Sequence, residues 1–448
     1  MAEPLALVPG DSLGPFRLGS ALFNVLNHVR SFRSTYPAVK VAWDEQAPSA
    51  SPIHLTLSSP PLHLTFSPPS QRLSRIEVLG PDPDTWVSYR GKRLRPSSAG
   101  DWAGARGDDD SDVVKTVRRV LGPTYGSSSA RGEGGKGEEE VLSYPGVAFG
   151  VVRTGSGSTM SRIVVTALPA PDGVPVDQAW LHPALPDSPA VAQGDLRLAE
   201  IHLDPSRRPT HVELHFHQPT TPLAPVELRI GETTSEDILC ELGAAVRTFW
   251  KEDDRLSIHT ASLGPRASSD TALEPNPYFL SYPHLGLTLL LSSCPSSPSS
   301  TSPSSTSPHP IPPHTLLKVL LHSNLPGEVQ FGRTARAECG LVVPGAGGAE
   351  RRGTEEGWGA VRAFLRGGDG GGRAGSSTAP GQGRGTAGSS SRREVELEVG
   401  VGNEPPMILD RTADGKDGVR GKTTEIHGFP GLALEVTGSG DIETVWLF

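Results

Sequence analysis

The stretch VELRIGETTSEDILCELG, which runs from Val226 to Gly243, decides the fold of this chain of 448 residues. Its first apolar residues, Val226, Leu228 and Ile230, alternate with polar residues, as in a strand that is buried on one face only. Gly231 then interrupts the alternation. The pattern predicts a strand that ends at Ile230, before Gly231.

A short helix is predicted immediately after this strand. Thr234 can cap its first turn, with Asp237 as the partner in a capping box. Ile238, Leu239 and Leu242 form one apolar stripe, and the closing glycine of the stretch suits a left-handed residue at the helix end. Because so short a helix is marginally stable in isolation, it must pack on a sheet.

Three further segments follow the same plan of a short helix and then a β-hairpin or meander. The first helix precedes predicted strands at His54–Leu57, Leu62–Phe66 and Leu73–Leu79. The apolar stripes of the other helices are Leu22, Val25, Leu26 and Val29 in the first, Val113, Val117, Val120 and Leu121 in the second (capped by Asp110 or Ser111), and Trp358, Val361 and Leu365 in the fourth. We therefore predict a β-rich α+β fold of about four diverged modules, each with one short helix packed on an antiparallel β-hairpin or meander.

An aromatic residue followed by proline recurs in three of the modules, as Tyr144-Pro145, Tyr282-Pro283 and Phe429-Pro430. Each pair precedes an apolar strand, and proline at the start of a strand costs no ladder hydrogen bond. The aromatic ring can then cover the open end of its module. We predict a structural role for this motif and not the stacking of a ligand.

Module boundaries follow from the repeats and from changes in composition. The predicted limits are residues 1–83 for the first module, 84–170 for the second, 171–225 for a connecting hairpin, 226–343 for the third module and 344–448 for the C-terminal module. Two tracts within these limits are expected to be disordered low-complexity insertions: the Ser/Pro-rich residues 292–313 and the Gly/Arg/Ser-rich residues 367–393. Neither tract can bury enough apolar surface to offset the entropy of the chain.

The overall composition restricts the class of protein. A net charge of −9 and a pI of about 5.9 argue against nucleic-acid binding and against direct capture by anionic lipid, because both need a basic surface. Cys240, Cys294 and Cys339 have no paired spacing, which fits a reducing compartment, and Cys240 is predicted to be a small buried residue. The N-terminus does not resemble a signal peptide, and the longest apolar run, residues 285–291, is too short to span a bilayer. We expect a soluble, cytoplasmic protein.

The best candidates for metal ligands are His211, Glu213, His215 and His217, which alternate along one predicted strand and therefore project from one face. A metalloenzyme of the cupin type has such an H-x-H pair, here His215 and His217, beside a carboxylate and a distant third histidine. The next acid in this chain, Glu227, lies beyond a loop interrupted by prolines. A solvated polar strand face is therefore the favoured interpretation, and a metal site of His211, His215 and His217 is the alternative.

Motifs for nucleotide or nucleophile chemistry lack the surroundings that they need. The GKTT sequence at Lys422 has Lys416 in the place of the first glycine of a phosphate-binding loop, and no helix is predicted after it. No GxSxG nucleophile elbow follows a predicted strand. We expect no catalytic residue and no cofactor, and hence no enzyme.

Four stretches of the chain resemble the phagosome assembly factor family. They are GPFRLGSALFNVLNHVR, RIGETTSEDILCELG, EPNPYFLSYPHLGLTLLL and LLKVLLHSNLPGEVQFGRTARAECGL. The resemblance runs in order from about Gly14 to Val343 and more weakly to Phe448, and it is most specific in the third module. It implies a cytosolic, β-rich protein without known catalytic residues, which acts in autophagy by pairing with a WD-repeat β-propeller protein. That pair associates with the forming autophagosome membrane through phosphoinositides.

These observations favour a non-enzymatic adaptor of autophagy that is recruited to the preautophagosomal structure. The resemblance implies a WD-repeat β-propeller partner, and through it an indirect contact with phosphoinositide membrane. No nucleic-acid partner is expected. Exposed sheet edges at the inserted hairpins are the expected docking surfaces, although the sequence does not identify partner-binding residues. Two alternatives stay open: a cupin-like metal-dependent enzyme that uses His215 and His217, and a general vesicle-trafficking scaffold.

Overall fold

The computed structural model describes most of the chain outside a few insertions and loops. The described residues are 5–80, 87–94, 113–124, 127–131, 138–154, 157–168, 172–175, 178–182, 184–186, 194–217, 224–250, 277–293, 313–345, 348–367, 406–409 and 423–448. The two tracts predicted to be disordered lie outside these residues except at their first or last positions, as do the predicted helix caps Asp110 and Ser111. Within the described part, no helix has the length and apolar character needed to cross a membrane.

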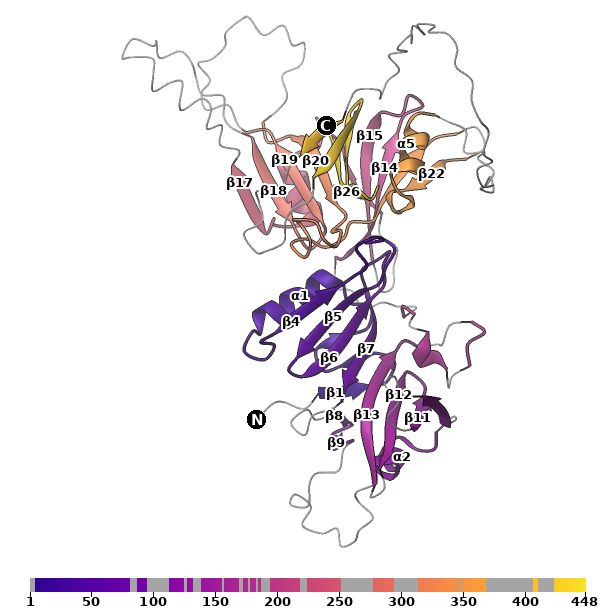
Figure 1. The fold of residues 1–448 in the computed structure, drawn as a ribbon. Helices are drawn as coiled ribbons and strands as arrows, with labels where there is room; N and C mark the ends of the chain where they lie inside the picture. Colours follow the sequence, from indigo (N-terminus) through magenta and orange to yellow (C-terminus); the bar gives the residue numbers. More distant parts are fainter. Residues whose placement is uncertain are drawn as a thin grey trace, which may run out of the picture.

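Four modules of one design follow each other along the chain: two or three leading strands, a short helix and a four-stranded antiparallel meander (Figure 1). The first comprises β1 (Leu5–Val8), β2 (Ser12–Leu13), β3 (Phe16–Arg17), α1 (Leu22–Ser31), β4 (Val39–Ala42), β5 (Ile53–Ser58), β6 (Pro61–Phe66) and β7 (Leu73–Leu79). The second comprises β8 (Val87–Tyr89), β9 (Lys92–Arg93), α2 (Val113–Leu121), β10 (Ser127–Arg131), β11 (Glu138–Tyr144), β12 (Val147–Thr154) and β13 (Gly157–Thr166), followed by the 3-10 turn η1 (Ala179–Leu181).

The second half of the chain repeats this order. The third module comprises β14 (Leu196–Leu203), β15 (Pro209–Phe216), β16 (Val226–Leu228), α3 (Ser235–Leu242), β17 (Arg247–Trp250), β18 (Tyr278–Tyr282), β19 (Leu287–Leu291) and β20 (Leu316–His322). The fourth comprises β21 (Cys339–Val343), β22 (Glu350–Gly353), the 3-10 turn η2 (Thr354–Glu356), α5 (Trp358–Leu365), β23 (Met407–Leu409), β24 (Thr424–Phe429), β25 (Leu432–Val436) and β26 (Ile442–Leu447). The predicted β-rich α+β class with about four modules is confirmed.

The modules combine in pairs into two halves of identical topology. The first half has a five-stranded sheet in the order β3-β2-β1-β8-β9 and an eight-stranded sheet in the order β10-β11-β12-β13-β7-β6-β5-β4. In the second half the orders are β16-β15-β14-β21-β22 and β23-β24-β25-β26-β20-β19-β18-β17. Each strand of the second half thus carries a number thirteen higher than its counterpart in the first. The chain is an internal duplication of a two-module unit.

Two strand pairings join the modules within each half. The first strands of the two modules pair in parallel, β1 with β8 and β14 with β21. The last strands pair antiparallel, β7 with β13 and β20 with β26. Both sheets of a half therefore contain strands from both modules, and neither module is a separate sheet. The elements of the first two modules lie within the limits taken from the sequence. In the second half the leading strands begin earlier: β14 and β15, in the predicted hairpin of residues 171–225, join the sheet that contains β16, and β21 begins before residue 344.

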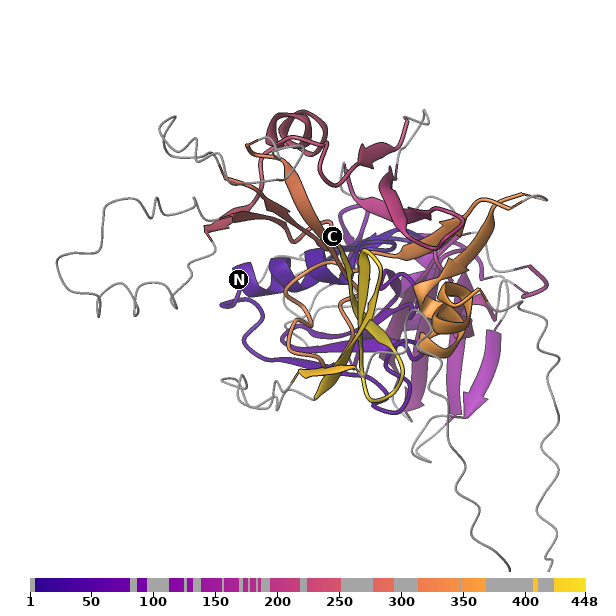
Figure 2. The same cartoon turned by 90° about the horizontal axis from the view of Figure 1, so that it is seen from above.

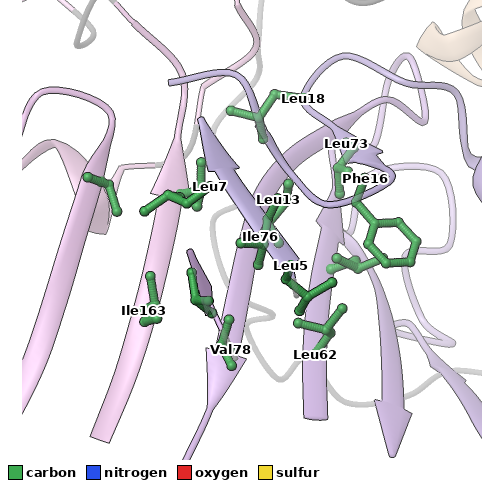
Figure 3. Close-up of a cluster of buried hydrophobic side chains, with 14 of the residues drawn as sticks. Leu5, Leu7, Leu13, Phe16, Leu18, Leu62, Leu73, Ile76, Val78 and Ile163 are labelled. Carbon is green, nitrogen blue, oxygen red and sulfur yellow. The ribbon is translucent and has the colours of Figure 1, made fainter. Parts of the chain in front are cut away.

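Each half has one large apolar core between its helices and its sheets. The predicted stripe of α1 is buried in the first core in full. Figure 3 shows Leu5 and Leu7 of β1 packed among Leu62, Ile76 and Ile163, which come from three strands of the eight-stranded sheet. Burial of one such side chain contributes about 1.5–3 kcal/mol to stability.

The predicted helix of the opening stretch is α3, and its capping box is confirmed. Thr234 Oγ1 accepts a hydrogen bond from the backbone N–H of Asp237 (3.3 Å), and Asp237 Oδ2 accepts one from the N–H of Thr234 (2.9 Å). Ile238 is fully buried, whereas Leu239 is 58% exposed and Cys240 is exposed. The predictions for Leu239 and Cys240 were wrong because successive residues turn by about 100° around a helix, so these two side chains point away from the sheet.

The aromatic–proline motif anchors the ends of two helices. The motif's aromatic residue ends one strand and its proline lies in the following turn, so the predicted place of the proline at a strand start was wrong. Tyr144 donates its hydroxyl proton to the carbonyl oxygen of Gly122 after α2 (2.9 Å), and Tyr282 does the same to Gly243 after α3 (2.9 Å). Phe429 has no hydroxyl and packs on the ring of Trp358 instead. These contacts support the predicted structural role.

A pair of buried side-chain amides joins the two halves, and we call it the joint. Asn324 Nδ2 donates to Gln71 Oε1 (2.7 Å), and Gln71 Nε2 donates to the carbonyl oxygen of Asn324 (2.8 Å). Asn324 Oδ1 accepts from the N–H of Gly332 (2.7 Å). Both amides are at most 2% exposed. Every hydrogen-bonding group of Asn324 that faces the joint has a specific partner, so the joint defines how the two halves meet.

Further contacts surround the joint on the side where α1 faces the second half (Figures 1 and 2). Arg30 at the end of α1 donates to the carbonyl oxygen of Gly332 (2.6 Å). The rings of Trp43 and Phe331 lie 5.7 Å apart. The segment that follows β20 therefore covers the helix side of the first module.

We predict that Asn324→Asp destabilises the protein by about 2–3 kcal/mol, because a buried carboxylate cannot donate to Gln71 Oε1 and is left without a compensating charge. Chemical denaturation at neutral pH measures the effect. Asn24→Asp, at a half-buried position in the first turn of α1, is the matched control and should change the free energy of unfolding by less than about 0.5 kcal/mol. Equal stability of Asn324→Asp and the unchanged protein would contradict the role given to the joint.

Candidate functional site

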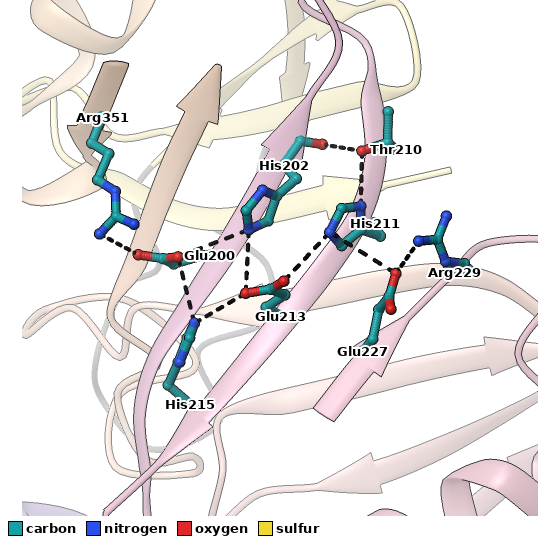
Figure 4. A network of polar contacts seen from close by, with 9 residues as sticks. All are labelled: Glu200, His202, Thr210, His211, Glu213, His215, Glu227, Arg229 and Arg351. Carbon is teal, nitrogen blue, oxygen red and sulfur yellow. Dashed lines mark hydrogen bonds and ion pairs between the residues drawn. The ribbon is translucent and has the colours of Figure 1, made fainter. Parts of the chain in front are cut away.

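Five ionisable side chains gather on the outer face of the hairpin of β14 and β15, and we call them the His–Glu cluster: Glu200, His202, His211, Glu213 and His215 (Figure 4). Their neighbours in sequence point inward to the apolar core, as alternation along a strand requires. In the register of the hairpin Glu200 lies opposite Glu213, and His202 lies opposite His211. The two strands thus bring two carboxylates and three imidazoles to one patch.

Four atoms of the cluster form a closed ring in which nitrogen and oxygen alternate. His202 Nε2 lies 3.8 Å from Glu200 Oε2 and 3.4 Å from Glu213 Oε2. His215 Nε2 lies 3.4 Å from the same Glu200 oxygen and 3.5 Å from the same Glu213 oxygen. Both nitrogens are shielded from solvent, and neither makes a hydrogen bond in the described structure. The ring has the donor atoms and the size to hold a cation or a shared proton.

Neighbouring side chains hold the cluster in place. Arg351 of β22 pairs with the second oxygen of Glu200 (2.9 Å). Thr210 donates its hydroxyl proton to the carbonyl oxygen of His202 and lies 3.0 Å from His211 Nδ1. Because that hydroxyl proton is already used, the contact with Thr210 favours the tautomer of neutral His211 that has its proton on Nδ1. Burial and the nearby imidazole of His202 lower the pKa of His211, which favours this neutral form.

The structure separates His217 from the residues with which the sequence grouped it. His211, Glu213 and His215 share one face of β15 as predicted, but β15 ends at Phe216. His217 instead lines a small cavity of about 30 Å³ near the joint. Its backbone N–H donates a hydrogen bond to the backbone carbonyl oxygen of Asp195. The predicted H-x-H pair of His215 and His217 therefore does not converge on one point.

The cavity beside His217 is strongly charged. Arg72 and Asp195 form a buried ion pair across it (3.4 Å), and Arg197, His284 and Arg336 also line it. Burial, followed by the positive charges of Arg72 and Arg197, lowers the pKa of His217 to about 4. This histidine is therefore neutral at physiological pH.

Sequence reasoning missed Glu200, His202 and Arg351. The segment LRLAEIHL lies within the predicted connecting hairpin of residues 171–225. The alternation of Glu200 and His202 in that segment, placed opposite Glu213 and His211, could have indicated the cluster. Arg351 could not have been found this way, because it reaches the cluster only through the parallel pairing of β14 with β21, a strand far away in sequence.

A second surface feature is an apolar edge on the third module, which we define by Leu239, Val246, Phe249 and Trp250. These side chains are between 49% and 61% exposed. They lie on α3, on β17 and just before β17, and β17 is the outermost strand of its eight-stranded sheet within the described residues. An edge strand has unpaired backbone groups that can accept another strand, and exposed aromatic side chains are common at protein interfaces.

The chain is similar to proteins of one family. The family model described as phagosome assembly factor 1 (PHAF1) matches residues 12–448. A PHAF1 protein of Arabidopsis thaliana is 23% identical over 460 aligned residues, which cover 99% of this chain and 92% of the plant protein. A PHAF1 protein of Drosophila melanogaster is 27% identical over 117 residues, which cover 26% of this chain and 22% of the fly protein. No solved structure matches the chain.

We predict that His217→Gln weakens the pH dependence of stability between about pH 6.5 and pH 4. In this window the unfolded chain protonates His217 but the folded protein does not, so acidification favours unfolding. The slope of the unfolding free energy against pH should become less steep in the variant, by an amount that corresponds to at most one bound proton per molecule. Denaturation curves at several pH values measure this slope, with His182→Gln, at an exposed position, as the control. An unchanged slope would show that His217 does not have the assigned pKa.

Proposed function

The chain belongs to the phagosome assembly factor 1 family, and from this premise we propose that it is a non-enzymatic adaptor of autophagy that binds a WD-repeat β-propeller protein. The family's name implies an autophagy-related role. The finer mechanism, with a propeller as the partner and recruitment to the preautophagosomal structure, comes from the resemblance described above. The single observation that supports an adaptor in this chain is the apolar edge.

The internal duplication supports a binding role for the apolar edge. Its counterpart in the first half is the side of α1, where the segment with Phe331 and Gly332 packs against Arg30 and Trp43. The described residues place no equivalent cover over the apolar edge, and Trp250 remains 61% exposed. Large exposed apolar patches generally mark sites of association. A β-propeller offers apolar loops and short strand edges that can pack on such a surface or extend it by strand addition.

The charge of the chain supports an indirect contact with membrane. The net charge is −9, whereas direct binding to phosphoinositides uses clustered basic side chains. The propeller partner would then provide the lipid contact. Binding of the purified chain to phosphoinositide vesicles, without a partner and as strongly as the complex, would contradict this part of the proposal.

A metal-dependent enzyme and the trafficking scaffold remain alternative proposals. The enzyme would have to use His215 together with His202, since His217 lies elsewhere. A scaffold unrelated to autophagy would bind trafficking proteins through the same apolar edge. The identity of the captured partner distinguishes these alternatives.

We predict that the double change Phe249→Asp and Trp250→Asp reduces capture of the WD-repeat partner by about tenfold or more, because exposed aromatic anchors dominate many interfaces. The full chain is used to capture proteins from its native cells, and bound proteins are identified and quantified by mass spectrometry. Val39→Asp on β4, at the topologically equivalent edge strand of the first half, is the control and should leave capture unchanged. Undiminished capture by the double variant would exclude the apolar edge, and a captured set without a WD-repeat protein would contradict the proposed partner.

A further inference from the structure

We propose that Glu200, His202, Glu213 and His215 form a binding site for one Zn²⁺ ion on the outer face of β14 and β15. Each residue provides one ligand atom, namely the four atoms of the ring described above (Figure 4). Imidazole nitrogen and carboxylate oxygen are both ordinary ligands of zinc.

The size of the ring fits a metal ion. Ligand atoms at about 2.0–2.2 Å from a tetrahedral Zn²⁺ lie roughly 3.3–3.5 Å from each other. Three of the four nitrogen–oxygen separations in the ring are 3.4–3.5 Å, and the fourth, from His202 to Glu200, is 3.8 Å. Ligand atoms of Glu200, Glu213 and His215 all lie within 4.8 Å of one another, so these three residues form the core of the site, and His202 would complete the shell by moving its side chain toward them.

The same separations do not fit direct hydrogen bonds. An N–H···O bond from imidazole to carboxylate is about 2.7–3.2 Å long. Both Nε2 atoms of His202 and His215 lack a hydrogen bond although they are shielded from solvent. Buried polar atoms normally have partners. Four donor atoms that converge without bonding to each other are arranged as ligands of a common ion.

The charges of the site favour a bound cation. Glu200 and Glu213 are directly opposite each other across the hairpin, and like charges in that position destabilise a sheet. The side chain of Glu200 is only 7% exposed and that of Glu213 is 27% exposed, so water screens this repulsion poorly. Arg351 neutralises one of the two carboxylates. A divalent ion in the ring would compensate the other.

The fold does not need these residues, because the first half is built without them. The outward positions of β1, the counterpart of β14, are occupied by Ala6 and Val8. The same hairpin and the same parallel pairing with the next module form there. The polar residues of the second half are therefore an addition to the common architecture, which suits a specific site better than a requirement of folding.

Four protein ligands would fill a tetrahedral shell and leave no open position for substrate. This is the pattern of structural zinc sites, whereas catalytic sites have three protein ligands and a water. The ion would tie β14 to β15 and, through Glu200 and Arg351, to β22 of the fourth module. The inference is independent of the partner and of the apolar edge.

Metal content and affinity of the full, tag-free chain test the site. After equilibration with Zn²⁺ and removal of free metal, elemental analysis should find one zinc per chain. His215→Ala and the nearly isosteric Glu213→Gln should each lower zinc affinity by roughly a hundredfold, and Arg351→Ala by about 10–100-fold as the loss of a group that orients a ligand. His427→Ala is the matched control, since His427 forms a single His–Glu pair with Glu425 on a strand surface, and it should retain one zinc.

Cobalt and thermal stability provide independent measurements. Co²⁺ bound to the chain should show the visible absorption of four-coordinate cobalt, and the bands should be absent in His215→Ala. Zinc should raise the melting temperature of the unchanged chain and of His427→Ala but not that of Glu213→Gln. Absence of bound zinc in the unchanged chain, or the same zinc affinity in His215→Ala and Glu213→Gln as in the control, would overturn the proposal. Tighter binding of Mn²⁺ than of Zn²⁺ would overturn the assignment of the ion.

Discussion

The pairing of the first and last strands of successive modules is the constraint on which the rest of this structure depends. A helix of eight to ten residues and a single meander cannot enclose a core, so each module needs a second one. The parallel pairing of β1 with β8 and the antiparallel pairing of β7 with β13 satisfy this need, and β14 with β21 and β20 with β26 satisfy it again. The two cores form where these shared sheets face each other and the helices.

The duplicated halves show how one backbone supports different contacts. Gln71 and His314 occupy equivalent places with positive φ, and their carbonyl oxygens accept hydrogen bonds from Leu22 and Ser235 at the starts of α1 and α3. The side chain of Gln71 turns to the joint, whereas His314 lies 3.0 Å from the hydroxyl of Tyr278. In the first half α1 also contacts the segment after β20 through Arg30, whereas Leu239 of α3 in the second half is exposed. Binding surfaces in this fold arise from what each half leaves uncovered.

The His–Glu cluster follows the same logic. Alternation along β15 was enough to predict that His211, Glu213 and His215 share a face, since this depends only on the local geometry of a strand. Their true partners Glu200 and His202 depend on the register of the hairpin, and Arg351 depends on a parallel pairing between distant segments. His217 was grouped with them on periodicity, but the strand ends before it and its side chain lines the cavity at the joint. Local periodicity predicts which face a side chain takes and cannot predict where a strand stops.

The sequence by itself determined the short helices, the apolar stripe of α1, the capping box of α3, the repeated module and the family, because these depend on interactions between residues that are close along the chain. Only the tertiary structure decided that the modules pair into two equivalent halves, that Gln71 meets Asn324, and that two carboxylates and two imidazoles form a ring. These features join residues that are far apart in sequence. No pattern within one segment encodes such a pairing, since it is set by how apolar faces of different segments cover one another.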